Sequence, residues 1–319
     1  MMKPMNLPQV SVVMSVYNGA SSLPNTLQSV LNQEGCDLEF IVINDGSSDG
    51  SGPLLDAWAK RDVRLRVIHQ ANTGLTRALT RGCAEARGES IARQDCGDVS
   101  LPGRLTRQLS ALHANHGLSF VSCATRYATD GGEFLYEARG SGTATAPIDV
   151  IDLSQAHGVL DGPAHHGSVM FRRSAYEKAG GYRPAFYFGQ DWDLWYRLAE
   201  RGQFQMLQDI LYEARIGVAD ISMNNKARQE MIGMQSLQAL RLRMAGLSDQ
   251  PALDAAALIR PSSQGSGHFR SAWRGYYFMG ECLRRNGNRD SARRYLSRAL
   301  KENPLHLKSW IRLCQARFG

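Results

Sequence analysis

The chain has 319 residues, of which 43% are hydrophobic and 31 are glycine, a composition typical of a globular protein with room for one large domain and a smaller one. No apolar run reaches the length of about 18 residues that a membrane-spanning helix needs, and the N-terminus MMKPMNLPQV lacks the apolar segment of a signal peptide, so we expect a cytoplasmic protein. The net charge of +7 is uneven, because residues 260–319 hold 13 Arg and Lys against 3 Asp and Glu. This basic region contains no base-reading module. Nucleic acid is therefore disfavoured, and an anionic membrane surface, a protein partner and a solvated helix face remain as alternatives.

Strand and helix patterns alternate along the first part of the chain. Helical patterns near 23–32, 52–61 and 74–86 separate strand-like runs at 10–16, 38–44, 65–70 and 89–95. This order predicts an α/β fold with a parallel sheet covered by helices on both faces. The carboxyl ends of parallel strands share one edge of the sheet, and that edge is where such sheets bind ligands.

Polar residues follow each of these four strands and should meet at that edge. They are Tyr17 with Asn18, Asp45–Asp49, Asn72–Leu75 and Asp95–Asp98. The NDGSSDG segment has neither the GxGxxG of a dinucleotide site nor the GKS/T of a P-loop, which disfavours hydride transfer and NTP hydrolysis. A nucleotide held by carboxylates and a metal ion agrees better with these residues.

The strict alternation ends after residue 105. LTRQLSALHANHG predicts a helix, LSFVSCATRYA and EFLYEAR predict strands, and HHGSVMFRRSAYEKAGGYRP predicts a short strand followed by a helix. GQDWDLWYRLAERG predicts a helix with Asp191 and Asp193 in its first turn, where negative charge suits the helix dipole. MIGMQSLQALRLRM predicts an amphipathic helix, and PSSQGSG predicts a linker at 261–267. We therefore expect a domain over 1–225, a helical connector and linker over 226–265, and a helical tail over 266–319.

The tail resembles a tetratricopeptide unit, because small and apolar residues over 273–306 follow a 34-residue helix-turn-helix spacing. One such repeat cannot bury its own apolar face. It must pack on the preceding helices, on a partner or on another subunit.

Six segments together resemble one enzyme family over about residues 8–230. They are SVVMSVYNG, IVINDGSSDGS, NTGLTRAL, GESIARQDCGD with LPGRLTRQ, HHGSVMFRR with GGYR, and GQDWDLWYRL. The chain is similar to the family-2 inverting glycosyltransferases, especially bacterial enzymes that build surface polysaccharides. The resemblance implies a GT-A nucleotide-diphospho-sugar transferase fold, a Rossmann-like mixed sheet flanked by helices, here with a C-terminal α-helical extension.

The resemblance also implies a donor site. Tyr17, Asn18 and Asp45 would lie near the nucleotide, Asp45 accepting a hydrogen bond from the base. Arg77 would approach the diphosphate, and Arg93 and Asp95 would complete the donor contacts.

The family's acidic motif usually reads Asp-x-Asp-Asp, with the metal ligand at its third position, where this chain has Gly97. Either Asp98 or Asp95 then holds the ion, or Arg93, Arg104 and Arg77 replace it. Because a divalent ion stabilises a leaving diphosphate, we expect Mg²⁺ or Mn²⁺ at Asp95 and Asp98, with His166 as a further ligand. Alternatively, these acids cap the helix that starts near Pro102.

A second acidic site lies at GQDWD, where the family usually has Glu-Asp and this chain has Gln190-Asp191. By the resemblance, Asp191 is the base that removes the proton from the acceptor hydroxyl, and it should lie close to Asp95 and Asp98. Without the neighbouring Glu, nothing in the sequence predicts a raised pKa for Asp191.

We therefore expect a glycosyltransferase that moves a sugar from a nucleotide-diphosphate donor to a hydroxyl of a glycan or lipid-linked acceptor with inversion, in polysaccharide, O-antigen or capsule synthesis. It would act at the inner face of the membrane. The alternative is a non-catalytic nucleotide-sugar-binding scaffold that uses its basic tail for assembly, because a carboxylate of the usual motif is missing.

Overall fold

The structure, a computed structural model, describes residues 7–140, 142–144, 162–187, 189–218, 226–260 and 272–318. The linker predicted at 261–267 lies outside these residues. Within the described ranges, no helix is both long enough and apolar enough to cross a bilayer.

The chain forms two compact units. Unit 1 contains the residues up to Thr125, then Arg139–Tyr212 and Gln229–Arg260. Unit 2 contains Arg126–Ala138, Glu213–Arg228 and the C-terminal helices. The helices that the sequence analysis assigned to a separate connector are thus largely part of unit 1.

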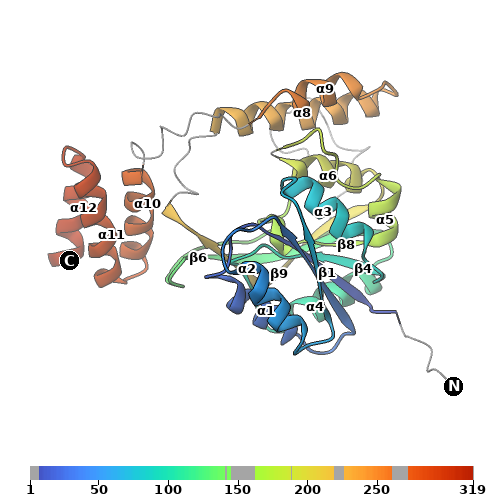
Figure 1. The fold of residues 1–319 in the computed structure, drawn as a ribbon. Coiled ribbons are helices and arrows are strands. Elements are labelled where there is room, and N and C mark those ends of the chain that lie inside the picture. Colours follow the sequence, from blue (N-terminus) through green and yellow to red (C-terminus); the bar gives the residue numbers. More distant parts are fainter. Residues whose placement is uncertain are drawn as a thin grey trace. The chain divides into compact units, whose positions relative to one another are not determined.

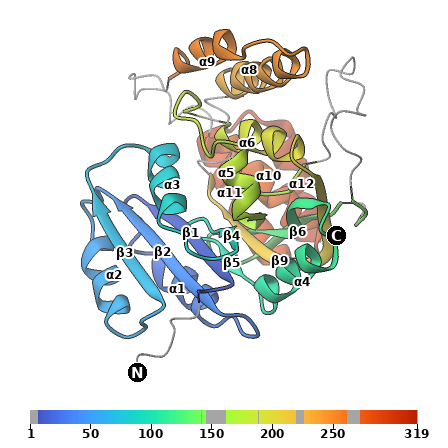
Figure 2. The same cartoon turned by 90° about the vertical axis from the view of Figure 1, so that its right-hand side faces the viewer.

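The first four strands form the parallel half of a mixed sheet, as predicted. β1 pairs in parallel with β2 and β4, and β2 pairs in parallel with β3 (Figure 2). Their carboxyl ends therefore share one edge. The strands are β1 (Val10–Val16), β2 (Leu38–Asp45), β3 (Leu65–Gln70) and β4 (Ser90–Arg93).

Antiparallel strands extend the sheet. β8 pairs antiparallel with both β4 and β6, and the order is β3-β2-β1-β4-β8-β6-β9-β5, with β7 beside β6. The sequence predicted β6, β7 and β8 but neither β9 nor the two-residue β5. The remaining strands are β5 (Val99–Ser100), β6 (Leu118–Thr129), β7 (Phe134–Ala138), β8 (Met170–Arg172) and β9 (Gln203–Ile216).

Helices cover both faces of the sheet (Figure 1), because successive side chains of a strand point to opposite sides. Val12 of β1 packs in a core with α1, α2 and α4, whereas Val13 packs in a core with α3, α5, α6 and α8. The helices of unit 1 are α1 (Leu23–Leu31), α2 (Ser51–Ala59), α3 (Leu75–Ala84), α4 (Arg104–Ala114), α5 (Arg173–Lys178), α6 (Gln190–Ala199), α8 (Lys226–Met244) and α9 (Gln250–Ala257).

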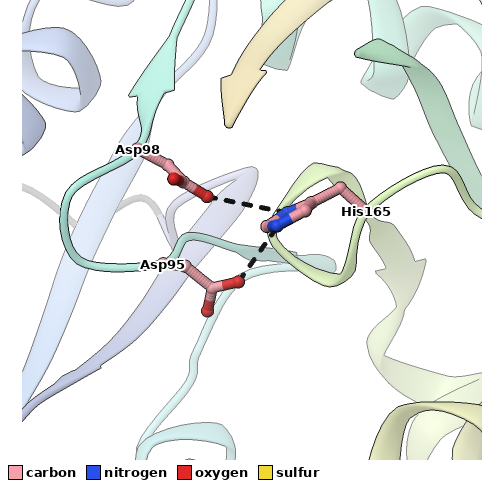
Figure 3. A group of neighbouring side chains, drawn as sticks. All are labelled: Asp95, Asp98 and His165. Carbon is pink, nitrogen blue, oxygen red and sulfur yellow. Dashed lines mark ion pairs between the residues drawn. The ribbon is translucent and has the colours of Figure 1, made fainter. Parts of the chain in front are cut away.

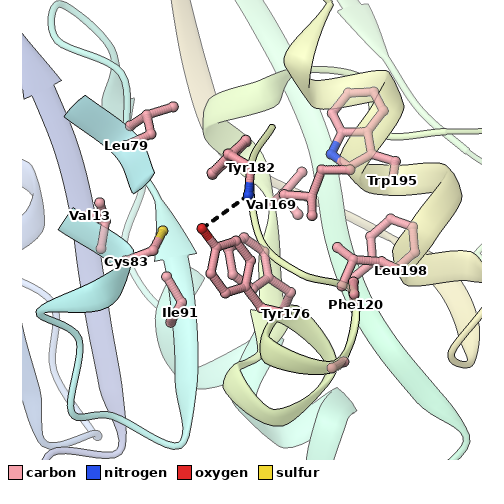
Figure 4. Close-up of a cluster of buried hydrophobic side chains, with 14 of the residues drawn as sticks. Val13, Leu79, Cys83, Ile91, Phe120, Val169, Tyr176, Tyr182, Trp195 and Leu198 are labelled. Atoms are coloured by element: carbon pink, nitrogen blue, oxygen red, sulfur yellow. Dashed lines mark hydrogen bonds between the residues drawn. The ribbon is translucent and has the colours of Figure 1, made fainter. Parts of the chain in front are cut away.

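The second of these cores fixes the position of α6 (Figure 4). Trp195 and Leu198 of α6 are buried there beside Phe120 of β6. The Tyr182 N–H donates a hydrogen bond of 3.2 Å to the Tyr176 hydroxyl, which ties the segment before α6 to α5. The start of α6, with Asp191, is therefore held by a packed core.

Unit 2 contains the predicted helical repeat: α10 (Ala272–Arg285), α11 (Arg289–Glu302) and α12 (Leu307–Phe318). A Cβ atom on Gly280 would lie 2.7 Å from Leu296, so the close approach of α10 and α11 requires a glycine there. The apolar face of the repeat packs against Leu135 of β7 within the same unit. The cluster that covers this face contains residues of strands and, among the described residues, none of the preceding helices, on which packing was one expected alternative.

Candidate active site

The turn Asp95–Asp98 follows β4 at the carboxyl edge of the sheet. Gly97 has a φ of +103°, which side chains rarely adopt, and its N–H donates to the Thr26 hydroxyl at 3.0 Å. That hydroxyl donates in turn to the Asp98 carbonyl at 2.9 Å, so α1 fixes the turn. The glycine that stands in place of a carboxylate is therefore required by the backbone.

The two carboxylates of this turn face one imidazole (Figure 3). His165 Nδ1 lies 3.8 Å from Asp95 Oδ2 and 3.6 Å from Asp98 Oδ2, and one ligand atom from each residue lies within 4.8 Å of the others. Two carboxylates and an imidazole are suitable ligands for Mn²⁺, and the carboxylates also suit Mg²⁺. The group therefore fits the predicted divalent ion. Ligation through Nδ1 would replace its 3.1 Å hydrogen bond from the Gly167 N–H.

His166, the histidine that the sequence analysis selected, has other partners. Its Nε2 lies 2.9 Å from the Tyr182 hydroxyl and 3.5 Å from Nε of Arg93. Burial, followed by the charge of Arg93, lowers the pKa of His166 to about 3, so its ring is neutral. His165 and His166 are neighbours in a segment that is extended at His165, and adjacent side chains of extended backbone point in opposite directions. His165 therefore takes the place that the sequence analysis gave to His166.

Two buried arginines, Arg93 and Arg104, hold the turn Asp95–Asp98 in place. Arg93 is fully buried, and it donates to Asp95 Oδ1 at 2.7 Å and to the Val13 carbonyl. Burial, the largest single cause, raises the pKa of Asp95, but Arg93 and the other positive groups around it together outweigh burial and hold the pKa below its usual value. Arg104, also fully buried, donates to the carbonyls of Arg93 and Gly167. We therefore assign Arg93 to positioning Asp95, in place of the donor contact expected from the sequence, and Arg104 to the structure of the turn.

Tyr212 of β9 is a site residue that the sequence analysis missed. Its hydroxyl donates to Asp98 Oδ2 at 2.8 Å and accepts from the Asp95 N–H at 3.2 Å. The Arg104 guanidinium lies 4.7 Å from the centre of its ring. Tyr212 therefore orients both ends of the acidic turn. The turn does not cap α4, whose N-cap is Gly103 without a side-chain hydrogen bond.

The residues predicted for the nucleotide meet at the same edge. The Asn18 side-chain oxygen accepts from the Ser48 N–H at 2.8 Å, which ties the loop after β1 to the loop after β2. Asp45 accepts from the Gly74 N–H at 2.9 Å, which ties β2 to the start of α3. Tyr17 is 58% exposed and leaves an open ring face beside this edge. The predicted convergence of the strand ends is thus present.

Asp191 lies in the first turn of α6, deep in unit 1 but with part of its surface open. Its carboxylate accepts from the Trp192 N–H at 2.9 Å. Burial raises the pKa of Asp191, the negative charge of Asp95 raises it further, and His165 lowers it. Nothing in the sequence indicated a raised pKa, because the missing Glu concerns only the neighbouring charge, whereas the main cause of the shift is burial. The pKa of Asp191 thus responds to the charges of Asp95 and His165, two of the residues that could hold a metal.

A cavity of about 760 Å³ opens beside Asp191. Arg77 of α3 and Trp192 of α6 are among its lining residues. Trp195, one turn further along α6, is buried in the core. The cavity therefore brings together the cation predicted for the donor and the carboxylate predicted for the acceptor.

Comparisons with known proteins identify similar sequences and similar folds. The profile of Glycosyl transferase family 2 matches residues 11–180, and a tetratricopeptide repeat profile matches residues 273–316. EpsE of Bacillus subtilis (strain 168), whose name assigns it to the glycosyltransferases, is 31% identical over 214 residues, which are 65% of this chain and 73% of EpsE. EpsJ of the same strain, an uncharacterized glycosyltransferase by name, is 38% identical over 117 residues, which are 37% of this chain and 34% of EpsJ.

Two solved structures have a similar fold. The mannosyltransferase PcManGT from Pyrobaculum calidifontis, in complex with GDP-Man and Mn²⁺, has a TM-score of 0.54 and 17% sequence identity, covering 98% of this chain and 87% of that chain. TarS 1–349 of S. aureus has a TM-score of 0.55 and 14% identity, covering 97% of this chain and 88% of that chain. At these identities the likeness concerns the fold alone, and it confirms the predicted GT-A architecture.

Proposed function

Since this chain belongs to glycosyl transferase family 2, we propose that it transfers a sugar from a nucleotide-diphosphate donor to a hydroxyl of a glycan or lipid-linked acceptor, with inversion at the anomeric carbon. The setting would be polysaccharide, O-antigen or capsule synthesis at the inner face of the membrane. The observation that carries the proposal is the common environment of Asp191 and the Asp95, Asp98 and His165 group.

Asp191 acts as the general base. Its raised pKa makes the carboxylate a better proton acceptor, and the cavity beside it has room for an acceptor sugar. The acceptor hydroxyl gives its proton to Asp191 as its oxygen attacks the anomeric carbon from the face opposite the leaving diphosphate. The bond to the diphosphate breaks in the same step, which inverts the configuration.

Asp95, Asp98 and His165 would hold a divalent ion, which when bound supplies positive charge to the diphosphate. Arg93 and Tyr212 keep the two carboxylates in place. Tyr17, Asn18 and Asp45 would bind the nucleotide at the strand ends, and Arg77 would contact the diphosphate.

The tail would attach the enzyme to an anionic membrane surface or a protein partner. Leu305 is 88% exposed and Trp310 is 49% exposed, and the exposed Lys301 and Lys308 lie near them in the chain. Apolar and basic side chains together are typical of surfaces that bind anionic membranes. If this is right, the double variant Leu305→Glu and Trp310→Glu sediments less with anionic vesicles than the wild type. If the double variant and the wild type sediment equally with the vesicles, the tail would bind a protein partner instead of a membrane.

The test of the transfer activity is a donor screen. UDP-, GDP- and dTDP-sugars are titrated with and without Mn²⁺, and hydrolysis of the bound donor is then measured for the wild type and Asp191→Asn. Metal-dependent turnover that the variant lacks supports the enzyme. Donor binding without turnover, with every acceptor tried, favours the non-catalytic scaffold, for which the missing carboxylate at Gly97 is the only indication.

A further inference from the structure

The cavity beside Asp191 is built to receive negative charge. The N-terminus of α3, after Gly74, and the N-terminus of α6, after Gly189, both line it. Each helix has ten residues, so each directs the positive end of its dipole toward the cavity.

Gln190 supplies an independent sign of a ligand. Its side chain lines the cavity and is only 6% exposed, yet its amide forms no hydrogen bond within the described part of the chain. Among the described residues, two side-chain oxygens are both sealed from solvent and without a hydrogen-bond partner, Ser90 Oγ and Ser122 Oγ. The Gln190 amide is not one of these sealed groups, so it remains accessible from the cavity. A largely buried amide that has no protein partner and faces a cavity is free to pair with a ligand there.

The charged side chains that line the cavity are two arginines and Asp191. Arg77 is exposed and has no ion pair within the described residues. Arg260 lies over the Tyr187 ring, 5.8 Å from its centre, and donates to the Ala185 carbonyl at 3.4 Å. Tyr187 therefore fixes the Arg260 guanidinium at the wall without neutralising it.

We propose that this cavity binds an acceptor with an anionic group close to the hydroxyl that receives the sugar. Arg260 pairs with the anion and the Gln190 amide donates a hydrogen bond to it, while Arg77 adds positive charge on the donor side. The anion is the carboxylate of an acidic sugar or a phosphate ester, which share this chemistry. The inference rests on the proposed function, because it assigns the acceptor of the same site.

The experiment is a titration followed by saturation-transfer NMR on the full chain, with and without Mn²⁺ and a saturating nucleoside diphosphate. The probes are methyl β-D-glucuronide, methyl β-D-glucoside and glucose 6-phosphate. We expect at least one anionic probe to bind about tenfold more tightly than the glucoside, because charge-assisted hydrogen bonds are worth more than neutral ones.

Four variants test the assignment. Arg260→Gln and Gln190→Glu should each abolish the preference for the anionic probe, and Arg260→Lys should restore part of it. Arg61→Gln, which removes an exposed arginine outside the cavity, should leave the preference unchanged. A preference for the glucuronide or for glucose 6-phosphate supports the proposal and shows whether the anion of the acceptor is a carboxylate or a phosphate ester. Because the readout is selectivity between probes, a variant that merely folds less well does not mimic the effect.

Two results overturn the proposal: equal binding of glucuronide, glucose 6-phosphate and glucoside, or displacement of the anionic probe by the nucleotide. The second would assign the cavity to the donor diphosphate. Failure of the proposed function can be told apart from failure of this inference. If the proposed function is wrong, the chain does not bind the nucleotide. The comparison of the three probes without nucleotide still decides whether the cavity prefers an anionic ligand.

Discussion

The acidic turn Asp95–Asp98 and the cavity wall around Asp191 both bring carboxylates to one site, but the protein holds them differently. Asp95 is paired with Arg93, and Asp98 accepts from Tyr212. On the cavity wall, Asp191 has no cationic partner within the described residues, and the Gln190 amide has no partner there either. The same residue type thus has opposite pKa shifts, lowered at Asp95 and raised at Asp191.

The difference separates two tasks. A carboxylate that must stay charged beside a metal ion is stabilised by fixed donors, because these favour its ionised form. A carboxylate that must accept a proton is left buried and unpaired, because burial raises its pKa. We therefore expect the substrate to bind beside Asp191 and Gln190, which lack such side-chain partners within the described residues. The paired Asp95 and Asp98 form the fixed part of the site.

The largest expected effect is on the cavity wall. Asp191→Asn should lower the transfer rate by about 10²–10⁴-fold, since the base is lost, while leaving donor and Mn²⁺ affinity unchanged. Single-turnover kinetics with radiolabelled donor measure the rate, and calorimetry measures binding. A variant that binds donor poorly would show instead that Asp191 belongs with the acidic turn.

Asp193, two residues further along α6, has the opposite character. Its buried carboxylate pairs with Arg183 and with Arg197, the latter at 2.6 Å. Asp193→Asn leaves the buried Arg197 without an ion pair among the described residues, while Arg183 keeps Asp249, and we expect it to lower the free energy of unfolding by about 3 kcal/mol. Urea denaturation measures this, with the exposed Asp254→Asn of α9 as the control. Equal stability of the two variants would contradict the division between support and reaction.

The sequence predicted the parallel half of the sheet because buried parallel strands form continuous apolar runs, as in VSVVMSV. β9 was missed because it alternates polar and apolar residues and carries Asp209, Glu213 and Arg215, which hide a strand from an analysis based on apolar runs. Its alternation, with Phe204 and Met206 buried, was the available signal.

The candidate site was predicted only in part. Asp95 and Asp98 were placed correctly because they follow β4, whose carboxyl end lies at the predicted edge, and Asp191 lies in the first turn of α6 as the helical pattern predicted. The choice between His165 and His166 depends on which way one extended residue points, and the role of Tyr212 depends on a contact with Asp98 across 114 positions of sequence. Spacing along the chain carries neither piece of information.

A smaller effect is expected in the support of the acidic turn. Tyr212→Phe removes the hydroxyl that donates to Asp98, and loss of such a contact usually weakens metal binding by about 10-fold or more. Mn²⁺ affinity is measured by paramagnetic relaxation of water without donor. Tyr176→Phe is a matched control, because it removes another core hydroxyl that touches no carboxylate of the turn. Equal Mn²⁺ affinity in the two variants would exclude Tyr212 as support for a metal ligand.

The smallest effect concerns stability and pH, and its sign differs between the two regions. The pKa of Asp191 is higher in the folded chain than in the unfolded chain, so the folded state binds more protons between these two values and stability falls as pH rises through them. Asp191→Asn removes this loss and should therefore melt at a higher temperature than the wild type at neutral pH, with the gain disappearing below the unfolded pKa.

For Asp95 the pKa is lower in the folded chain than in the unfolded chain. Its contribution to stability is therefore present above the unfolded pKa and is lost as pH falls through the folded pKa. Asp95→Asn, measured with a chelator, should accordingly melt at a lower temperature at neutral pH. Thermal unfolding of both variants across this pH range measures the two effects. If Asp191→Asn and Asp95→Asn shift the melting temperature in the same direction, the two carboxylates are not held differently.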